Sequence, residues 1–166
     1  NTLLLAERGW SGVAVDASWE VVPKALEAYR NLNVKFISAA VGVTPGLVPF
    51  FDCTHANLST CSEGLLKKTP DMRTLKGTRL VPCITVRQIA EAFPGPFEYI
   101  SVDLEGMTWP VLQTMPLKDL GCRMACVEYL HPIYTGMNEE SKIKEYMASN
   151  GFSFKASNPS NLVFVR

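Results

Sequence analysis

The stretch Phe97–Gly106, with the sequence FEYISVDLEG, decides the fold class because it is the clearest buried strand in the chain. Its apolar and β-branched residues predict a strand over 97–104. Asp103 and Glu105 are two positions apart, so on an extended chain they face the same side. Gly106 follows and permits a backbone turn that a side chain would block. The stretch therefore predicts a buried strand whose carboxyl end carries paired carboxylates.

Comparable segments lie on both sides of this strand and alternate with helical patterns. Apolar, β-branched runs predict further strands over 11–16, 34–41 and 123–130, and shorter ones at LVPFFD and RLVPCITV. Apolar residues at helical spacing predict helices over 19–31, 85–93, 107–115 and 141–150. FSFKA and NLVFVR predict a terminal antiparallel hairpin. This alternation is typical of a mostly parallel sheet with helices on both faces, so we expect an α/β fold.

The length and charge of the chain restrict its partners. We expect a single domain over residues 1–166, since this length can bury a core without staples. Lys and Arg together number 16, as do Asp and Glu, so the formal net charge is zero. A nucleic acid needs a basic footprint and a membrane span needs a long apolar run. Neither a nucleic-acid nor a membrane partner is therefore expected, and the oligomeric state stays open.

The number and spacing of the five cysteines indicate whether the protein resides in an oxidising or a reducing compartment. An odd number without a CxxC pair indicates neither a disulfide framework nor a zinc site. Reduced thiols are typical of the cytoplasm, and no signal-peptide pattern opens the sequence. We therefore expect a cytoplasmic protein, although a chain that starts at Asn1 rather than Met does not exclude an upstream leader.

The polar segment from Cys53 to Thr78 lacks periodicity and predicts a long irregular loop, which is usually functional or a lid. It contains or adjoins a modest group of basic residues, namely Lys67, Lys68, Arg73, Lys76 and Arg79. We interpret this group as a solvated loop, in preference to a site that attracts an anionic substrate.

Ligands of open parallel sheets bind beyond the carboxyl ends of the strands, so acids there are candidate site residues. Asp16 ends a buried strand, where an acid accepts hydrogen bonds from ribose hydroxyls or else caps the next helix. Asp103 and Glu105 could hold a metal, raise one another's pKa for base catalysis, fix an amine, or cap a helix. Glu128 ends another strand, and His131 beyond it could act as base or metal ligand, although a lone histidine is more often structural. We assign no metal site.

The order and spacing of these motifs resemble the FkbM-type methyltransferases. The resemblance covers nearly the whole chain and is carried by NTLLLAERGWSGVAVDAS, SAAVG, TVRQI, ISVDLEGMTWPVL and CVEYLHP. DLEG followed by an apolar helix is its most specific part. These enzymes have a Rossmann-like fold and use S-adenosylmethionine, typically to methylate a hydroxyl oxygen. The resemblance thus implies O-methylation of a small molecule or carbohydrate.

The resemblance also implies a cofactor side of the site. Asp16 would bind the ribose hydroxyls, together with Ala17, although the family more often has Glu followed by Pro at these positions. Ala40 and Val41 would lie near the adenine, and Ser59 matches a loop over the cofactor.

On the acceptor side, Asp103 and Glu105 match acids that lie near the methyl group and the acceptor. Either could take the hydroxyl proton, with His131 as a weaker candidate base. Thr108 stands where the family often has another acid or a small residue.

Asn1 as a helix cap and Gly9 as a stop predict a short helix over LLLAERG. The family's first strand and glycine-rich loop precede this helix and are not in the sequence. That loop holds the methionine end of the cofactor, and its strand supplies backbone hydrogen bonds to its neighbours. We therefore predict that residues 1–166 alone bind S-adenosylmethionine weakly or not at all. Isothermal titration calorimetry checks this, and a micromolar dissociation constant for these residues alone would contradict it.

Two alternatives remain open from the sequence. A nicotinamide-dependent oxidoreductase shares the ribose-binding acid but gives no reason for DLEG on a later strand, and the GxGxxG motif is absent. A non-catalytic fragment or binding domain would keep the scaffold without the cofactor loop. Mass spectrometry of a bound cofactor would distinguish the oxidoreductase from the methyltransferase. The coding region upstream of Asn1 would distinguish the non-catalytic fragment from the complete enzyme.

Overall fold

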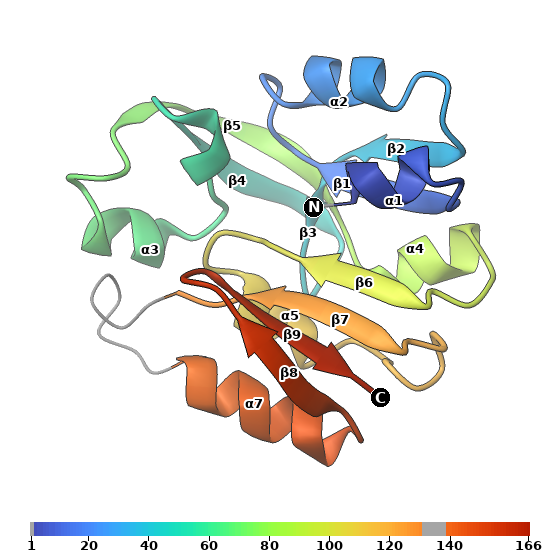
Figure 1. Ribbon diagram of the computed structural model, residues 1–166. Coiled ribbons are helices and arrows are strands. Elements are labelled where there is room, and N and C mark those ends of the chain that lie inside the picture. Colours follow the sequence, from blue (N-terminus) through green and yellow to red (C-terminus); the bar gives the residue numbers. More distant parts are fainter. Residues whose placement is uncertain (1, 131–138) are drawn as a thin grey trace.

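The computed structural model describes residues 2–130 and 139–166, in which helices are interspersed with strands along the chain (Figure 1). His131 falls between these ranges, so that candidate base lies outside the described residues. The helices are α1 (Leu3–Glu7), α2 (Val22–Ala28), the 3-10 helix η1 (Ala56–Leu58), α3 (Glu63–Lys68), α4 (Val86–Ala92), α5 (Thr108–Leu112) and α7 (Glu139–Ser149). The strands are β1 (Gly12–Asp16), β2 (Val34–Ser38), β3 (Ala40–Val41), β4 (Gly46–Cys53), β5 (Leu75–Ile84), β6 (Tyr99–Val102), β7 (Met124–Glu128), β8 (Ser153–Ser157) and β9 (Asn161–Val165). The predicted mixed α/β class is confirmed.

The described strands form small sheets of mixed direction. Their orders are β1-β2, β3-β5-β4 and β6-β7-β9-β8. The pairs β1–β2, β3–β5 and β6–β7 are parallel, whereas β4–β5, β7–β9 and β8–β9 are antiparallel. The terminal hairpin is present as predicted, but the expectation of one mostly parallel sheet is not confirmed.

The strand predicted over 34–41 is divided into β2 and β3. β2 pairs with β1 as far as Ser38, and the Ala39 N–H donates to the Asp16 carbonyl at 3.1 Å. From Ala40 the chain pairs instead with β5, opposite Cys83. The single-strand prediction was wrong because the apolar pattern continues across the point where the chain changes partner.

β1 and β6 face each other across a hollow. Within the described residues, β1 pairs with β2 alone and β6 with β7 alone. One pocket is lined by Asp16 and Asp103, at the carboxyl ends of the two strands, and a second by Gly12 and Tyr99, at their amino ends. The two strands therefore run in the same direction with facing unpaired edges. A further strand in this gap, which the family resemblance implies, stays a prediction.

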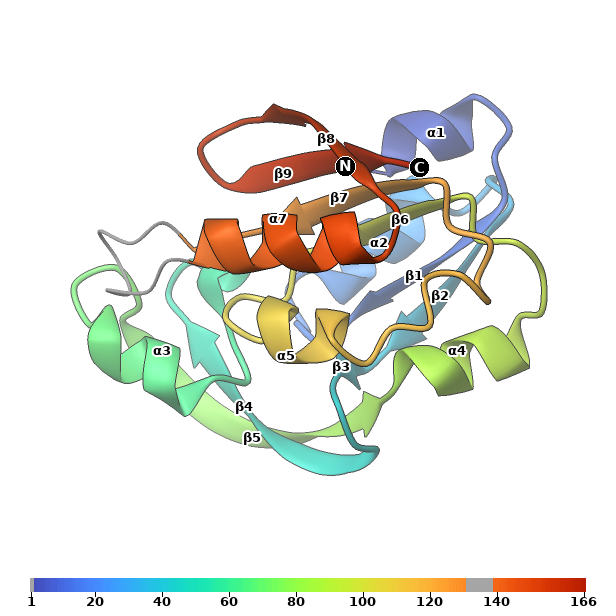
Figure 2. The same cartoon turned by 90° about the horizontal axis from the view of Figure 1, so that it is seen from below.

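The largest core cluster lies among α5, α7, β7 and β9. Figure 2 shows α7 beside the β8–β9 hairpin, on the side of the molecule that also carries α5. The most deeply buried aliphatic and aromatic side chains of this cluster are Val111, Leu112, Val127, Ile143, Met147, Leu162 and Phe164. Ala125 and Val127 of β7 belong to this cluster, and the strand ends one residue later at Glu128.

The segment predicted as an irregular loop, Cys53 to Thr78, contains η1, α3 and the start of β5. Ser62 caps α3, since its Oγ accepts the Leu65 N–H at 3.2 Å. The loop prediction was wrong here because helices this short show no recognisable periodicity.

Two helix ends carry local signals that are recognisable in the sequence. Thr85 and Gln88 form a capping box at the start of α4, and Gly9 after α1 has φ +89°. α2 and β6 are shorter than predicted, because only part of each apolar pattern is regular. None of the helices in the described ranges is long and apolar enough to cross a bilayer.

Candidate functional site

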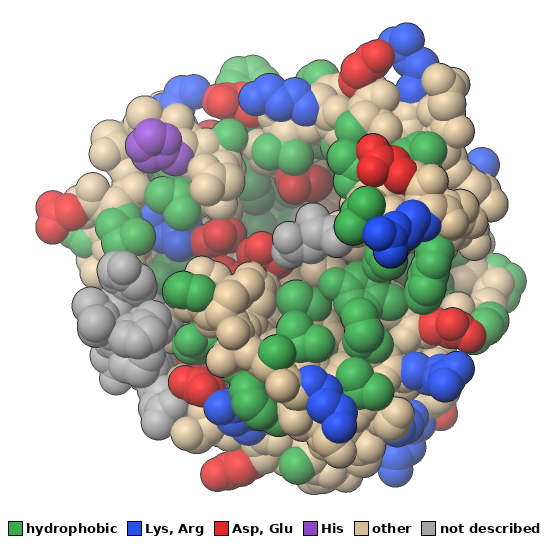
Figure 3. All heavy atoms as spheres, viewed as in Figure 1, with side chains coloured by type: hydrophobic (Ala, Val, Ile, Leu, Met, Phe, Trp, Pro, Cys, Tyr) green, Lys and Arg blue, Asp and Glu red, His purple; other side chains and the backbone are tan. Residues whose placement is uncertain are grey.

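One pocket of about 610 Å³ collects most of the residues that the sequence singled out. It lies over the carboxyl ends of β1 and β6, beside β3 and η1, and Figure 3 shows acidic side chains in a hollow flanked by hydrophobic ones. The predicted site residues that line it are Asp16, Ala17, Ala40, Val41, Ser59, Asp103 and Glu105. The fold therefore brings together candidates from widely separated parts of the chain.

Asp16 is the last residue of β1 and supports the backbone that follows it. Its Oδ1 accepts the Ser18 N–H at 2.7 Å, which shapes a turn ahead of α2 rather than capping the helix itself. Burial raises the pKa of Asp16, and the nearby Asp103 carboxylate acts in the same direction. Asp16 thus combines a local structural contact with a place in the pocket wall.

Arg79 of β5 fixes the backbone next to this turn. Its Nε donates to Asp52 Oδ2 at 2.7 Å, and its Nη2 donates to the Ala17 carbonyl at 2.5 Å. The guanidinium lies 4.8 Å from the Phe50 ring centroid and 5.9 Å from that of Trp19. The interpretation of the basic group as a solvated loop is therefore wrong for Arg79.

The DLEG motif forms a tight turn rather than the end of an extended strand. β6 ends before Asp103, Glu105 has φ +46° and Gly106 has φ +92°. The argument from strand alternation was therefore wrong, yet one oxygen each of Asp103, Glu105 and Glu128 lie within 4.8 Å of one another. A Cβ on Gly106 would meet Leu65 Cδ2 at 2.9 Å, so the turn packs closely against α3.

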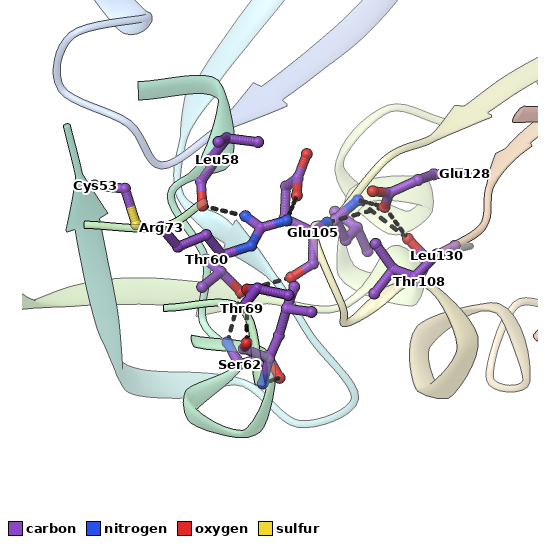
Figure 4. Close-up of polar contacts among 12 residues, drawn as sticks. Cys53, Leu58, Thr60, Ser62, Thr69, Arg73, Glu105, Thr108, Glu128 and Leu130 are labelled. Carbon is purple, nitrogen blue, oxygen red and sulfur yellow. Dashed lines mark hydrogen bonds and ion pairs between the residues drawn. The ribbon is translucent and has the colours of Figure 1, made fainter. Parts of the chain in front are cut away.

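The polar segment holds Glu105 from two points (Figure 4). Arg73 Nη2 donates to Glu105 Oε2 at 2.6 Å, and the Arg73 side chain is 4% exposed. The other arm of the guanidinium donates to the Leu58 carbonyl, and the Thr60 hydroxyl donates to the Glu105 carbonyl at 2.5 Å. Burial raises the pKa of Glu105, while the Arg73 guanidinium opposes that rise. The solvated-loop interpretation is therefore wrong for Arg73 as well.

Glu128 lies behind the same turn, at the buried end of β7. Its Oε2 accepts the N–H groups of Leu104 and Glu105, both at 3.0 Å, and the Thr108 hydroxyl at 2.8 Å. Burial raises the pKa of Glu128 to about 8, and the Glu105 and Asp103 carboxylates act in the same direction. The Glu128 side chain thus supports, from behind, the turn that carries both candidate acids.

Two of the three neighbouring carboxylates have protein partners of their own. Glu105 is paired with Arg73, and one oxygen of Glu128 accepts three hydrogen bonds. These contacts account for the cluster of Asp103, Glu105 and Glu128 as a hydrogen-bonded network. We assign no metal to it.

Sequence reasoning missed the contacts of Thr60, Arg73 and Glu128. Glu128 carried a usable signal, because an acid inside the apolar run ACVEYL is buried only when it has partners. Thr60 and Arg73 carried none, since each lies in a polar segment where such residues are ordinarily solvated.

Comparison with known proteins identifies the family. No curated protein and no solved structure matches the chain. A family model described as the methyltransferase FkbM domain matches residues 1–154, a range that includes every predicted site residue in the pocket. The chain therefore belongs to the FkbM methyltransferase domain family.

Proposed function

We propose that this protein transfers a methyl group from S-adenosylmethionine to a hydroxyl oxygen. The observation that carries the proposal is the pocket that Asp16, at the end of β1, shares with Asp103 and Glu105, just beyond β6. The carboxyl ends of parallel strands are where α/β folds bind nucleotide-like ligands. Membership of the FkbM family supports methyl transfer as the reaction.

The surroundings of Asp16 fit the adenosine part of this cofactor. A carboxylate offers acceptor oxygens to two ribose hydroxyls. The Oγ of Ser18, which also lines the pocket, is buried and has no hydrogen-bond partner within the described structure, so a ligand hydroxyl would satisfy it. Ala40, Val41 and Phe50 give an apolar wall suited to a base. Bound there, S-adenosylmethionine would supply an electrophilic methyl group.

Asp103 is the proposed proton acceptor. It is exposed towards the pocket, and desolvation by the pocket walls raises its pKa, although a hydrogen bond with Glu128 opposes the rise. A carboxylate with a raised pKa is a better general base. The acceptor oxygen would gain the methyl group while its proton passes to Asp103. Glu105, already paired with Arg73, would orient the acceptor.

The charge of the pocket favours a neutral acceptor. Asp16, Asp103 and Glu105 line it, and Arg73 compensates Glu105. An anionic acceptor would be repelled by the remaining carboxylates. We therefore propose a hydroxyl of a small molecule or sugar as the acceptor. The zero formal net charge supports the proposal that nucleic acids are not partners.

Replacing Asp103 with Asn tests the mechanism. We expect methyl transfer to fall at least about 100-fold, because the amide cannot accept the hydroxyl proton, while cofactor binding stays close to wild type. The assay follows labelled methyl from S-adenosylmethionine into a panel of monosaccharides, polyols and phenols, using the natural full-length protein. Asp119→Asn, at an exposed position after α5, is the control. Unchanged turnover in the Asp103 variant would remove this residue from the mechanism.

A further inference from the structure

The end of β7 places one carboxylate oxygen at the centre of the turn that carries both candidate acids. Glu128 is 5% exposed, and its Oε2 accepts two successive backbone N–H groups, those of Leu104 and Glu105. The same oxygen accepts the Thr108 hydroxyl, and Thr108 Oγ1 in turn accepts the Leu104 N–H at 3.1 Å. Figure 4 shows these contacts converging on Glu128. One side chain thus joins β7, the turn after β6 and the first turn of α5.

This turn needs such support because its backbone is unusual. Glu105 has φ +46°, which a residue with a side chain adopts rarely. Its N–H donates to Glu128 Oε2, and its carbonyl accepts the Thr60 hydroxyl. The conformation of Glu105 is therefore fixed from both ends of the residue.

The carboxyl group of Glu128 also interacts with Asp103. One oxygen of each side chain lies within 4.8 Å of the other. Two carboxylates at this separation repel each other, and a proton on one of them removes the repulsion and allows a hydrogen bond between the two groups. We infer that Glu128 is a positioning residue that carries this proton, donates it in a hydrogen bond to Asp103, and holds the 103–106 turn in place.

The surroundings decide which of the two acids is protonated. Glu128 is buried, whereas Asp103 is exposed to the pocket, so the neutral form is favoured at Glu128. Among the described residues, the charged groups that act on Glu128 are Asp103 and Glu105, both acidic, and Arg73 is paired with Glu105. Its partner on β9 is Asn161, which carries no charge. The raised pKa of Glu128, about 8, agrees with this assignment.

The consequence for catalysis rests on the proposed function. A protonated Glu128 donates to Asp103 and so stabilises the ionised form, the form that accepts a proton from a hydroxyl. It also fixes the orientation of the Asp103 carboxylate towards the pocket. Glu128 acts through Asp103 and does not itself touch the acceptor in this proposal.

Glu128→Gln tests the inference, since a Gln side chain can accept the same hydrogen bonds and donate to Asp103 but does not titrate. The folded protein holds the Glu128 proton up to a pKa of about 8, above the ordinary value of 4.5 that applies after unfolding. The contribution of the Glu128 proton to stability is therefore fully present below about pH 4.5, is lost as the pH rises through about 8, and is absent beyond. We expect this contribution to lower the wild-type Tm by roughly 10 °C across this range, and Glu128→Gln to remove that part of the fall.

Two controls complete the design. Glu139→Gln is the same exchange at another buried glutamate, whose carboxylate accepts the Leu130 N–H, and it should keep the wild-type fall in Tm. Glu128→Ala removes the acceptor of three hydrogen bonds, so it should lower Tm throughout the pH range. Carboxyl-carbon NMR of the wild-type protein measures the Glu128 titration directly and should give a midpoint near 8.

Several results would overturn the inference. These are an NMR midpoint below about 5, the range of an ordinary Glu, an equal pH-dependent fall in wild type and Glu128→Gln, or failure of Glu128→Gln to fold. In the methyl-transfer assay, Glu128→Gln should keep most of the activity that Glu128→Ala loses, and equal losses in the two variants count against positioning. If the wild type transfers no methyl group, the proposed function fails, while the NMR and Tm results still decide the state of Glu128.

Discussion

Replacing Arg73 with Met is expected to lower the free energy of unfolding by about 3–5 kcal/mol at pH 7, the usual cost of breaking a buried ion pair by removing one partner. Arg73 donates to the Glu105 carboxylate and to the Leu58 carbonyl, and its side chain is 4% exposed. Met fills much of the same volume, so the loss comes mainly from Glu105, whose side chain is 21% exposed and keeps its charge without its partner. Urea denaturation of both proteins measures the difference.

The pH dependence of this loss identifies its cause. The Arg73 guanidinium holds down the pKa of Glu105, so in Arg73→Met that pKa rises further and Glu105 takes up a proton at mildly acid pH. The difference from wild type should therefore be smaller at pH 5 than at pH 7. Lys67→Met breaks an exposed ion pair with Glu63 and should stay close to wild type. A loss below 1 kcal/mol for Arg73→Met at pH 7 would show that the pair does not hold the turn.

Replacing Gly106 with Ala should cost about 2–5 kcal/mol, from two effects that add. At φ +92° a side chain costs about 1–2 kcal/mol, and crowding a packed position costs about 1–3 kcal/mol. The new Cβ would lie 2.9 Å from Leu65 Cδ2 and 3.2 Å from the Cβ atoms of Leu65 and Ser62, so α3 would have to shift. The free energy of unfolding from urea titration measures this cost.

Gly77→Ala is the matched control for that exchange. Gly77 lies in β5, its φ is not in the left-handed region, and a Cβ there has nothing within 4 Å. We expect a change close to zero. Equal stability of the two variants would mean that the turn at Gly106 relaxes freely and that the contact with α3 has little energetic weight.

The sequence predicted those features that depend on neighbouring residues. The position of Asp16 at the end of β1, the start of a helix near Thr85 and the terminal hairpin all follow from short-range patterns of polarity and turn chemistry. The family was also predictable, because its motifs are short and keep their order. Pattern reasoning therefore located the pocket that these residues line.

The contacts inside the pocket were not predictable in this way. Arg73 lies 32 positions from Glu105, and Thr60 lies 45 positions from it, so their pairing depends on the fold rather than on sequence spacing. The positive φ of Glu105 breaks the strand alternation that the sequence suggested. Likewise, the continuous pattern through 34–41 could not show that the chain changes sheet at Ala39.

The three contacts that hold Glu105 also restrict how the sequence of such a protein can diverge. Thr60 binds its carbonyl, Arg73 binds its carboxylate and Glu128 binds its N–H, from three separate segments. Substitutions at Ala56, Asn57 or Cys61, which also line the pocket, can reshape its wall, whereas a change at Thr60 or Arg73 also disturbs the turn. The pocket wall is therefore freer to vary at those three positions than at Thr60 and Arg73.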